Sequence, residues 1–165
     1  MYNANNINAA IAIGKYFDVS NDDIRQAIEN YIPENNRSQL VHKNSNEIIL
    51  DAYNANPSSM KVAIENFIQL EKENKVAILG DMFELGHESV SEHRAIVDML
   101  LKIENIDCFF IGKDFFESSI DKKHLHFYDT FESFANAMKN VAFNGHMILI
   151  KGSRGMALER ALEFI

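Results

Sequence analysis

The stretch at residues 47–80, EIILDAYNANPSSMKVAIENFIQLEKENKVAILG, decides how this chain folds. Its two ends, EIILDAY and KVAILG, are short and almost wholly apolar, which is typical of strands buried on both faces. Between them, Asn56 and Pro57 are suited to the N-cap and the first position of a helix. The inward stripe of that helix consists of Met60, Ala63, Ile64, Phe67 and Ile68. A buried strand, an amphipathic helix and a second buried strand in succession predict two parallel strands covered by a helix.

The same alternation extends in both directions from this stretch. Upstream, the run SQLVHK and the turn NSN predict a hairpin with the first of the two strands. Downstream, the strand-like runs CFFIG, LHFY and HMILIK alternate with helical patterns. We expect a short helix after CFFIG, a helix capped by Ser89 and Glu92, one through Phe131 that ends near Gly145, and a last one in GSRGMALERALEFI. From Arg37 onward we therefore predict an α/β fold, a Rossmann-like, mainly parallel sheet with helices on both faces.

The first 33 residues follow a different pattern. One helical face carries Ile7, Ala10, Ile11 and Gly14. Ser20 and Asp23 then resemble a capping box that opens a second helix, which Pro33 ends. These residues predict a short helical segment that precedes the sheet and belongs to a different structural unit.

The composition limits the class of protein. The chain has 165 residues, of which 47% are apolar and 24% charged, so we expect a globular fold of one domain or slightly more. A net charge of −8 without a basic run argues against nucleic acid as a partner. The single cysteine, Cys108, lies in an apolar run and is expected to be a packing residue. No apolar stretch is long enough for a membrane segment and no signal peptide is recognisable, so we expect a cytoplasmic protein.

Three polar clusters follow predicted strands. They are DAYNANP at residues 51–57, GDMFELG at residues 80–86 and KGSRG at residues 151–155. Because ligands bind beyond the carboxyl ends of parallel strands, we expect the clusters to share one crevice. Taken singly, each cluster is explained by a cap or a tight turn. Taken together, Lys151, Ser153, Arg154 and the amides of a helix start suit a carboxylate or a phosphate. The residues by themselves are compatible with an enzyme or with a binding module.

The other sequence patterns do not point to a further kind of site. The six histidines form no i, i+4 ligand pair on one helix, so we predict no metal site. The phosphate-binding pattern G-x-x-x-x-G-K-[ST] does not occur in the sequence.

The stretches DAYNANPSSM, ILGDMFELG and LIKGSRGMALE, in that order, closely resemble the carboxy-terminal domain of the Mur ligases. The opening, YNANNINAAIAIGKYF, is similar to the family's HN-x-x-N-x-x-A-A helix, with Tyr2 where histidine is usual. The resemblance implies that residues 1–36 are the last helices of a central ATPase domain and that residues 37–165 are the carboxy-terminal domain.

The resemblance also implies an activity, ATP-dependent amide formation in peptidoglycan synthesis, which underlies cell shape and cell division. The strings YNANP and KGSR favour the members that join D-alanyl-D-alanine to UDP-N-acetylmuramoyl-tripeptide through an acyl phosphate. In that family ATP and Mg²⁺ are held by a phosphate loop, metal ligands and a carbamylated lysine that would all precede Met1. By this resemblance the chain carries no catalytic residue and is inactive without its own amino-terminal and central domains.

The family's ligand contacts transfer to particular positions. On the nucleotide side, Asn6 resembles the adenine-side asparagine, Arg37 the arginine near the ribose and phosphates, and Asp51 the acid that bonds the ribose hydroxyls. Leu50 stands where the family often has a first acid before Asp51. On the substrate side the resemblance implies Asn54, Asn56, Asp81, Lys151, Ser153 and Arg154. The last three would meet either the carboxylate of the dipeptide or the acyl phosphate.

Two alternatives stay open. One is a non-catalytic α/β module that binds a small anion or a nucleotide and regulates a partner. The other is a Mur ligase that adds a different amino acid. The sequence does not distinguish diaminopimelate from lysine as the third residue of the tripeptide.

Overall fold

The computed structural model describes residues 4–31 and 35–165. They form two compact units, Met1–Pro33 and Glu34–Ile165, which we call the helical unit and the α/β unit and describe separately. Tyr2 and Pro33 lie outside the described residues.

The helical unit contains two helices, α1 (Ala4–Tyr16) and α2 (Asn21–Glu29). The hydroxyl of Ser20 accepts a hydrogen bond from the backbone N–H of Asp23 at 3.1 Å, which confirms Ser20 as the N-cap of α2. A Cβ atom at Gly14 would lie 2.8 Å from the side chain of Ile24. The two helices therefore pack closely at Gly14.

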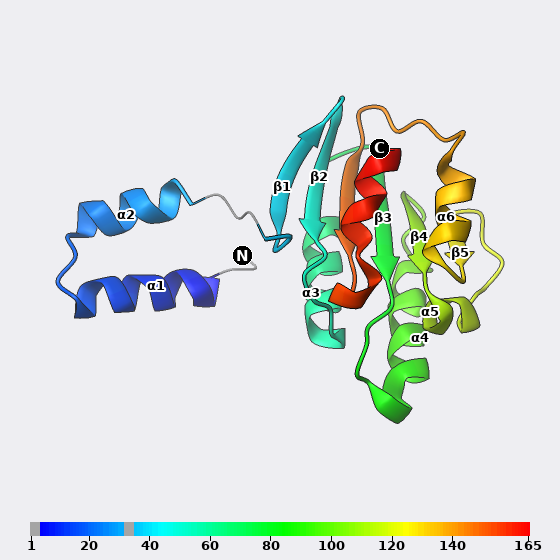
Figure 1. Cartoon of the computed structure of the whole chain (residues 1–165), viewed down its shortest axis with the longest axis horizontal. Helices are drawn as coiled ribbons and strands as arrows, with labels where there is room; N and C mark the ends of the chain where they lie inside the picture. Colours follow the sequence, from blue (N-terminus) through cyan, green and yellow to red (C-terminus); the bar gives the residue numbers. More distant parts are fainter. Residues whose placement is uncertain (1–3, 32–34) are drawn as a thin grey trace. The chain divides into compact units, whose positions relative to one another are not determined.

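The α/β unit is built on a six-stranded sheet in the order β1-β2-β6-β3-β4-β5 (Figure 1). The strands are β1 (Gln39–Lys43), β2 (Asn46–Asp51), β3 (Lys75–Gly80), β4 (Ile106–Ile111), β5 (Leu125–Tyr128) and β6 (Met147–Lys151). Only β1 runs antiparallel, as the outer strand of the predicted hairpin with β2. All other neighbours are parallel, which confirms the predicted fold class.

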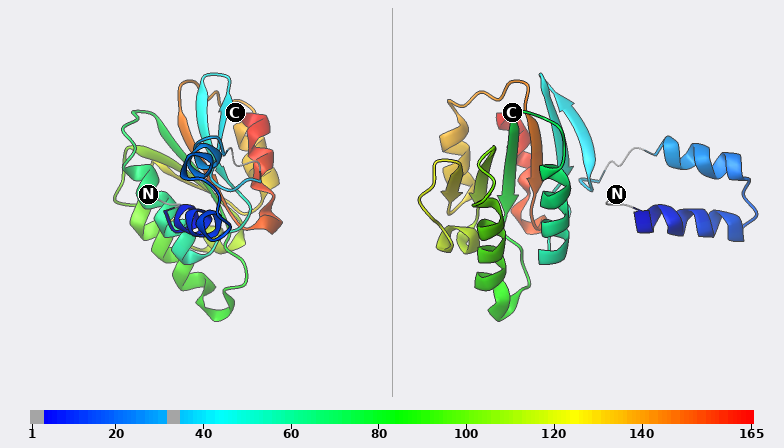
Figure 2. Two further views of the ribbon diagram at one scale, coloured as in Figure 1. Left: turned by 90° about the vertical axis from the view of Figure 1, so that its left-hand side faces the viewer. Right: turned by 180° about the vertical axis from the view of Figure 1, so that it is seen from behind.

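Helices cover both faces of this sheet. The helices α3 (Pro57–Ile68), α4 (Ser89–Leu100) and α5 (Lys113–Glu117) pack on one face, and α6 (Phe131–Met138) and the 3₁₀ helix η3 (Leu158–Phe164) pack on the other. The views from the two sides show α3 and α4 opposite the carboxy-terminal helix (Figures 1 and 2). Along β3, Ala77 and Leu79 pack in the core beneath α3, α4 and α5, and Val76 and Ile78 pack in the core beneath α6 and η3. This alternation explains why the strands are apolar throughout.

Two predicted helix starts were wrong. Ser89 was expected as an N-cap, but the 3₁₀ turn η1 (Gly86–Glu88) leads directly into α4, and Ser89 donates its hydroxyl to Asp114 at 2.7 Å. The last helix was expected to continue from the KGSRG cluster. Instead the short 3₁₀ helix η2 (Arg154–Met156) is separated from η3 by Ala157 in a left-handed conformation, φ 48°. This break turns Leu158 onto the backbone of Gly80 and Gly152.

The end of α6 also differs from the prediction. The helix ends at Met138, before Phe143 returns to the core against β6. The cysteine behaves as expected, since burial and the nearby Asp107 raise the pKa of the Cys108 thiol to about 12.

Candidate functional site

The three polar clusters meet at the carboxyl ends of β2, β6 and β3. Asp51 and Leu79 are both in register with Lys151, so the ends of the three strands lie side by side. The backbone N–H of Ser153 donates to the carbonyl of Asp81 at 3.1 Å. The predicted convergence of stretches far apart in the sequence is thus confirmed.

A buried ion pair lies beneath this edge. The ammonium of Lys151 contacts the carboxylate of Asp51 at 2.6 Å, and the exposed fractions of the two side chains are 1% and 9%. Lys151 also donates to the carbonyl of Asn54 at 3.2 Å, and Asp51 accepts the backbone N–H of Ser38 at 3.0 Å. Each of these two predicted ligand-binding residues therefore already has two partners within the protein. In this arrangement they fix the loop after β2 to the end of β6.

Ser153 connects all three clusters. Its hydroxyl accepts the backbone N–H of Phe83 at 2.8 Å and donates to the carbonyl of Ala55 at 3.4 Å. The side chain is buried, and the bond to Ala55 is buried while the bond to Phe83 is partly buried. Ser153 thereby positions the loop that carries Phe83 against the loop after β2.

Asp81 is held at the start of α5. Its carboxylate accepts the backbone N–H groups of Asp114 at 3.1 Å and of Phe115 at 3.0 Å. Gly112 lets the carboxylate come this close, because a Cβ atom there would lie 2.2 Å from Asp81, and its φ of 125° also favours glycine. Burial raises the pKa of the Asp81 carboxyl, against the opposing effect of the two N–H donors.

His93 is a member of this network that the sequence analysis missed. It is fully buried on α4, and its Nε2 atom accepts the backbone N–H of Met82 at 2.9 Å. Nε2 therefore carries no proton, and Nδ1–H donates to the carbonyl of Ser89 at 2.7 Å. The signal that identifies it is the i, i+4 pair of Ser89 and His93 on the inner face of the helix that follows the GDMFELG cluster.

A hollow of about 270 Å³ opens where the three clusters meet. We call it the first hollow; it is lined by Tyr53, Asn54, Phe83, Glu84, Ser153, Arg154 and Gly155. Arg154 and Glu84 bring opposite charges to it, and Arg154 also contacts Glu159 at 3.3 Å. Glu84 has a left-handed φ of 65°, an uncommon conformation for this residue type. A hollow with both charges suits a zwitterion such as an amino acid or a short peptide.

A second hollow of about 360 Å³ adjoins the first. Its lining includes Asp81, Lys113, Asp129 and Arg160, and it shares Phe83 and Gly155 with the first hollow. Phe83 is 44% exposed, whereas Met82 before it is fully buried. The two hollows are thus neighbours along the ends of the strands and share the Phe83 side chain.

The remaining predicted residues lie in three places. Asn54 lines the first hollow, and its Oδ1 atom accepts the backbone N–H of Ala55 at 2.9 Å. Asn56 caps α3 as predicted, with its side chain accepting the N–H of Ser59 at 2.8 Å. The guanidinium of Arg37 lies 3.8 Å from the centre of the Tyr53 ring, which lines the first hollow. Asn6 lies on α1 of the helical unit.

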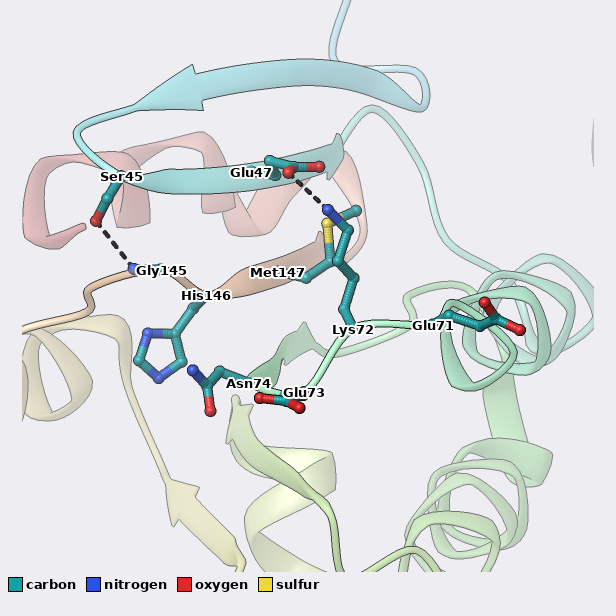
Figure 3. Close-up of a pocket in the computed structure, with 9 residues that line it drawn as sticks. All are labelled: Ser45, Glu47, Glu71, Lys72, Glu73, Asn74, Gly145, His146 and Met147. Atoms are coloured by element: carbon teal, nitrogen blue, oxygen red, sulfur yellow. Dashed lines mark hydrogen bonds and ion pairs between the residues drawn. The ribbon is translucent and has the colours of Figure 1, made fainter.

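A third hollow, of about 330 Å³, lies at the opposite edge of the sheet, where β2, β3 and β6 begin (Figure 3). Lys72 reaches across it to Glu47 at 2.7 Å, and Ser45 accepts the backbone N–H of Gly145 at 2.9 Å. None of the predicted site residues lines this hollow. It is a polar, solvent-facing depression, separate from the candidate site.

Among residues 4–31 and 35–165, no group of three or more His, Cys, Asp or Glu side chains is placed to hold a metal ion. None of the helices in those ranges is long and apolar enough to cross a membrane.

The structure defines a Rossmann-like α/β domain with two adjoining hollows at the carboxyl ends of its strands, and comparison with known proteins places it in a family. The family described as "Mur ligase, glutamate ligase domain" matches residues 36–154. The chain belongs to the Mur ligase family.

Individual relatives agree with this assignment. The UDP-N-acetylmuramoyl-tripeptide–D-alanyl-D-alanine ligase of Bacillus subtilis is 33% identical over 98% of this chain and 37% of its own length. The crystal structure of MurF from Acinetobacter baumannii has a TM-score of 0.83 and 27% identity, and covers 98% of this chain and 37% of that one. MurF of Thermotoga maritima in complex with ADP has the same fold, with a TM-score of 0.73 and 23% identity over 93% of this chain and 35% of that one. The chain thus spans a little over a third of the relatives it matches.

Proposed function

We propose that this chain is the carboxy-terminal, substrate-contacting part of an ATP-dependent ligase that joins D-alanyl-D-alanine to UDP-N-acetylmuramoyl-tripeptide in the cytoplasm. The observation that carries the proposal is the first hollow, which presents Arg154 and Glu84 at the meeting point of the three clusters. A dipeptide in its ordinary state has one carboxylate and one ammonium, and this hollow offers a partner to each. The related ligase of Bacillus subtilis, a UDP-N-acetylmuramoyl-tripeptide–D-alanyl-D-alanine ligase, supplies the substrate class.

The residues of this chain act by positioning. Arg154 offers planar N–H donors to the carboxylate of the dipeptide, and Glu84 offers an acceptor to its ammonium. Asn54 has both a donor and an acceptor, so it serves either group without repelling the other. In well-oriented systems, holding two reactants together lowers the barrier by about 7–11 kcal/mol. The chain therefore contributes to amide formation without an acid or base of its own.

We assign only some of the contacts to the nucleotide to residues of this chain. When bound, ATP supplies the phosphoryl group that activates the tripeptide carboxylate as an acyl phosphate. Arg37 fits an anionic ligand because its guanidinium is held on the Tyr53 ring and keeps its charge there. Asn6 and Asp51 are the other candidate contacts, and Asp51 would have to share its carboxylate with Lys151. We assign Mg²⁺ to no residue of this chain. We propose that the amino-terminal and central domains of the same protein are partners of this chain.

The test is a coupled phosphate-release assay on the full-length protein with ATP, Mg²⁺ and UDP-N-acetylmuramoyl-tripeptide. We expect release that depends on D-alanyl-D-alanine and is far slower with single amino acids. The 165-residue chain alone is expected to be inactive. Turnover by the chain alone, or equal rates with unrelated amines, would contradict the proposal and favour a different ligase or a binding module.

The asparagines provide a second test. Asn54→Ala removes the amide at the first hollow, and we expect a higher KM for the dipeptide or a lower kcat. Asn56→Ser retains an N-cap oxygen while removing the amide, so a kinetic effect here reports more than helix stability. Unchanged KM and kcat in both variants would exclude the asparagines from substrate binding.

A further inference from the structure

The ring of Phe83 borders both the first and the second hollow. It is the one large apolar side chain in both linings, and a Cβ atom at Gly155 would lie 2.7 Å from its Cε2 atom. The ring therefore rests directly on the backbone at Gly155. The lining of the first hollow also includes Asn54 and Arg154, and that of the second includes Lys113 and Asp129.

The backbone that carries this ring is fixed on both sides. The N–H of Phe83 is bound by the hydroxyl of Ser153 at 2.8 Å, and the N–H of Met82 by His93 at 2.9 Å. Met82 itself is fully buried. The ring is exposed to solvent, and the backbone from which it extends is held in place by these two hydrogen bonds.

We infer that Phe83 is a specificity-determining residue, a wall that limits the incoming amine to small side chains. The inference rests on the proposed function of the first hollow. That hollow, at about 270 Å³, is near the lower end of the size of small-molecule sites, roughly 300–1,000 Å³. In this inference a dipeptide with two methyl side chains occupies the first hollow, and a bulkier side chain directed toward the second hollow meets the ring.

The experiment compares full-length wild-type protein with Phe83→Ala, using D-alanyl-D-alanine and two dipeptides in which either residue is D-leucine. The measured quantity is the ratio of kcat/KM for D-alanyl-D-alanine to that for each bulky dipeptide. We expect Phe83→Ala to lower this ratio about tenfold or more for at least one of them, because single methylene groups change kcat/KM by about 10–200-fold in apolar pockets. Phe83→Leu should give an intermediate ratio.

The matched control is Phe116→Ala on α5, which removes a ring of similar exposure, 46%, outside all three hollows. Its ratio should equal that of the wild type. If the wild-type protein is active on D-alanyl-D-alanine and both Phe83→Ala and Phe83→Leu show the wild-type ratio, Phe83 does not determine specificity. The proposed function is unaffected by that result. A wild-type protein that uses none of the dipeptides would overturn both.

Discussion

The two ends of β2 carry two ion pairs with nearly the same geometry and very different surroundings. At the first end, Glu47 contacts Lys72 at 2.7 Å, and both side chains are about half exposed, 40% and 48%. At the other end, Asp51 contacts Lys151 at 2.6 Å, and the exposed fractions fall to 9% and 1%. Distance therefore does not distinguish the two pairs, whereas access to water does.

The difference shows at which edge of the sheet the polar side chains are held in fixed positions. Exposed pairs contribute little to stability because water and salt screen them. A buried pair need not stabilise the fold relative to apolar residues, but removing one partner leaves an uncompensated charge. The carboxyl edge also holds Asp81 and His93 in buried hydrogen bonds and Ser153 in a partly buried one, whereas the amino edge is a solvent-facing rim. The polar groups at the carboxyl edge are thus fixed before any ligand arrives.

The largest expected effect comes from breaking the buried pair. Lys151→Met leaves Asp51 buried without its cation, and we expect the free energy of unfolding to fall by about 3–5 kcal/mol. Urea denaturation measures this loss. The double variant Asp51→Leu with Lys151→Met should recover much of it, because no lone charge remains. A single variant as stable as the wild type would show that water reaches this pair as it reaches Glu47 and Lys72.

The next effect concerns His93. His93→Phe keeps a ring against Phe115, which His93 now contacts edge-on with ring centres 4.6 Å apart, but it removes the acceptor for the N–H of Met82. We expect a loss of about 1–3 kcal/mol, the cost of leaving a buried donor unpaired. The matched control is His87→Phe on the exposed turn η1, where thermal and urea denaturation should detect no comparable loss. Equal effects of the two substitutions would contradict a special role for His93.

A smaller effect is expected in the pH dependence of stability. Because burial raises the pKa of the Asp81 carboxyl, the folded state retains its proton above the pH at which the unfolded state releases it. Stability contributed by this group is complete below the ordinary aspartate pKa and is lost as the pH rises through the raised one. The difference in unfolding free energy between wild type and Asp81→Asn should therefore fall with pH in that window. A flat difference would mean that Asp81 titrates normally.

The smallest effect is expected at the exposed pair. The hydrogen bond and charge of Lys72 lower the pKa of the Glu47 carboxyl. Any stability linked to this shift is present above the ordinary glutamate pKa and is lost as the pH falls through the lowered one. Lys72→Met should return the Glu47 titration, followed by NMR of the carboxyl carbon, toward its ordinary range. Urea denaturation should be nearly unchanged, and a large change would erase the contrast between the two ends of β2.

Much of the fold was predictable because local and global signals agree. Asn56 and Pro57 start α3 where the sequence indicates, since the N-cap bond to Ser59 is formed within one turn. Ser89 misled the prediction because its hydroxyl bonds Asp114, a residue that reaches it only in the folded chain. The break at Ala157 was equally hidden, because it depends on the packing of Leu158 against the glycines at the ends of β3 and β6.

The sequence predicts where the candidate site lies better than it predicts the contacts within the site. The ends of parallel strands bring Asp51, Asp81 and Lys151 to one edge, and the sequence indicates this directly. The pairing of Asp51 with Lys151 depends on the register of β2 against β6, which no local pattern specifies. His93 was passed over because the i, i+4 pair of Ser89 and His93 does not by itself show that Nε2 accepts the N–H of Met82. The roles assigned to the site residues toward a ligand stay predictions.

The position of β6 has a consequence for how the protein is made. β6 is the last strand in the sequence, yet it fills the centre of the sheet between β2 and β3. While the ribosome synthesises the chain, β2 and β3 have no hydrogen-bonded neighbour on their facing sides until residues 147–151 emerge. Contacts of such long sequence separation form slowly, and unpaired strand edges attract other chains in the meantime. Translational pausing just before Met147 would therefore lengthen the interval in which a nascent chain depends on chaperones.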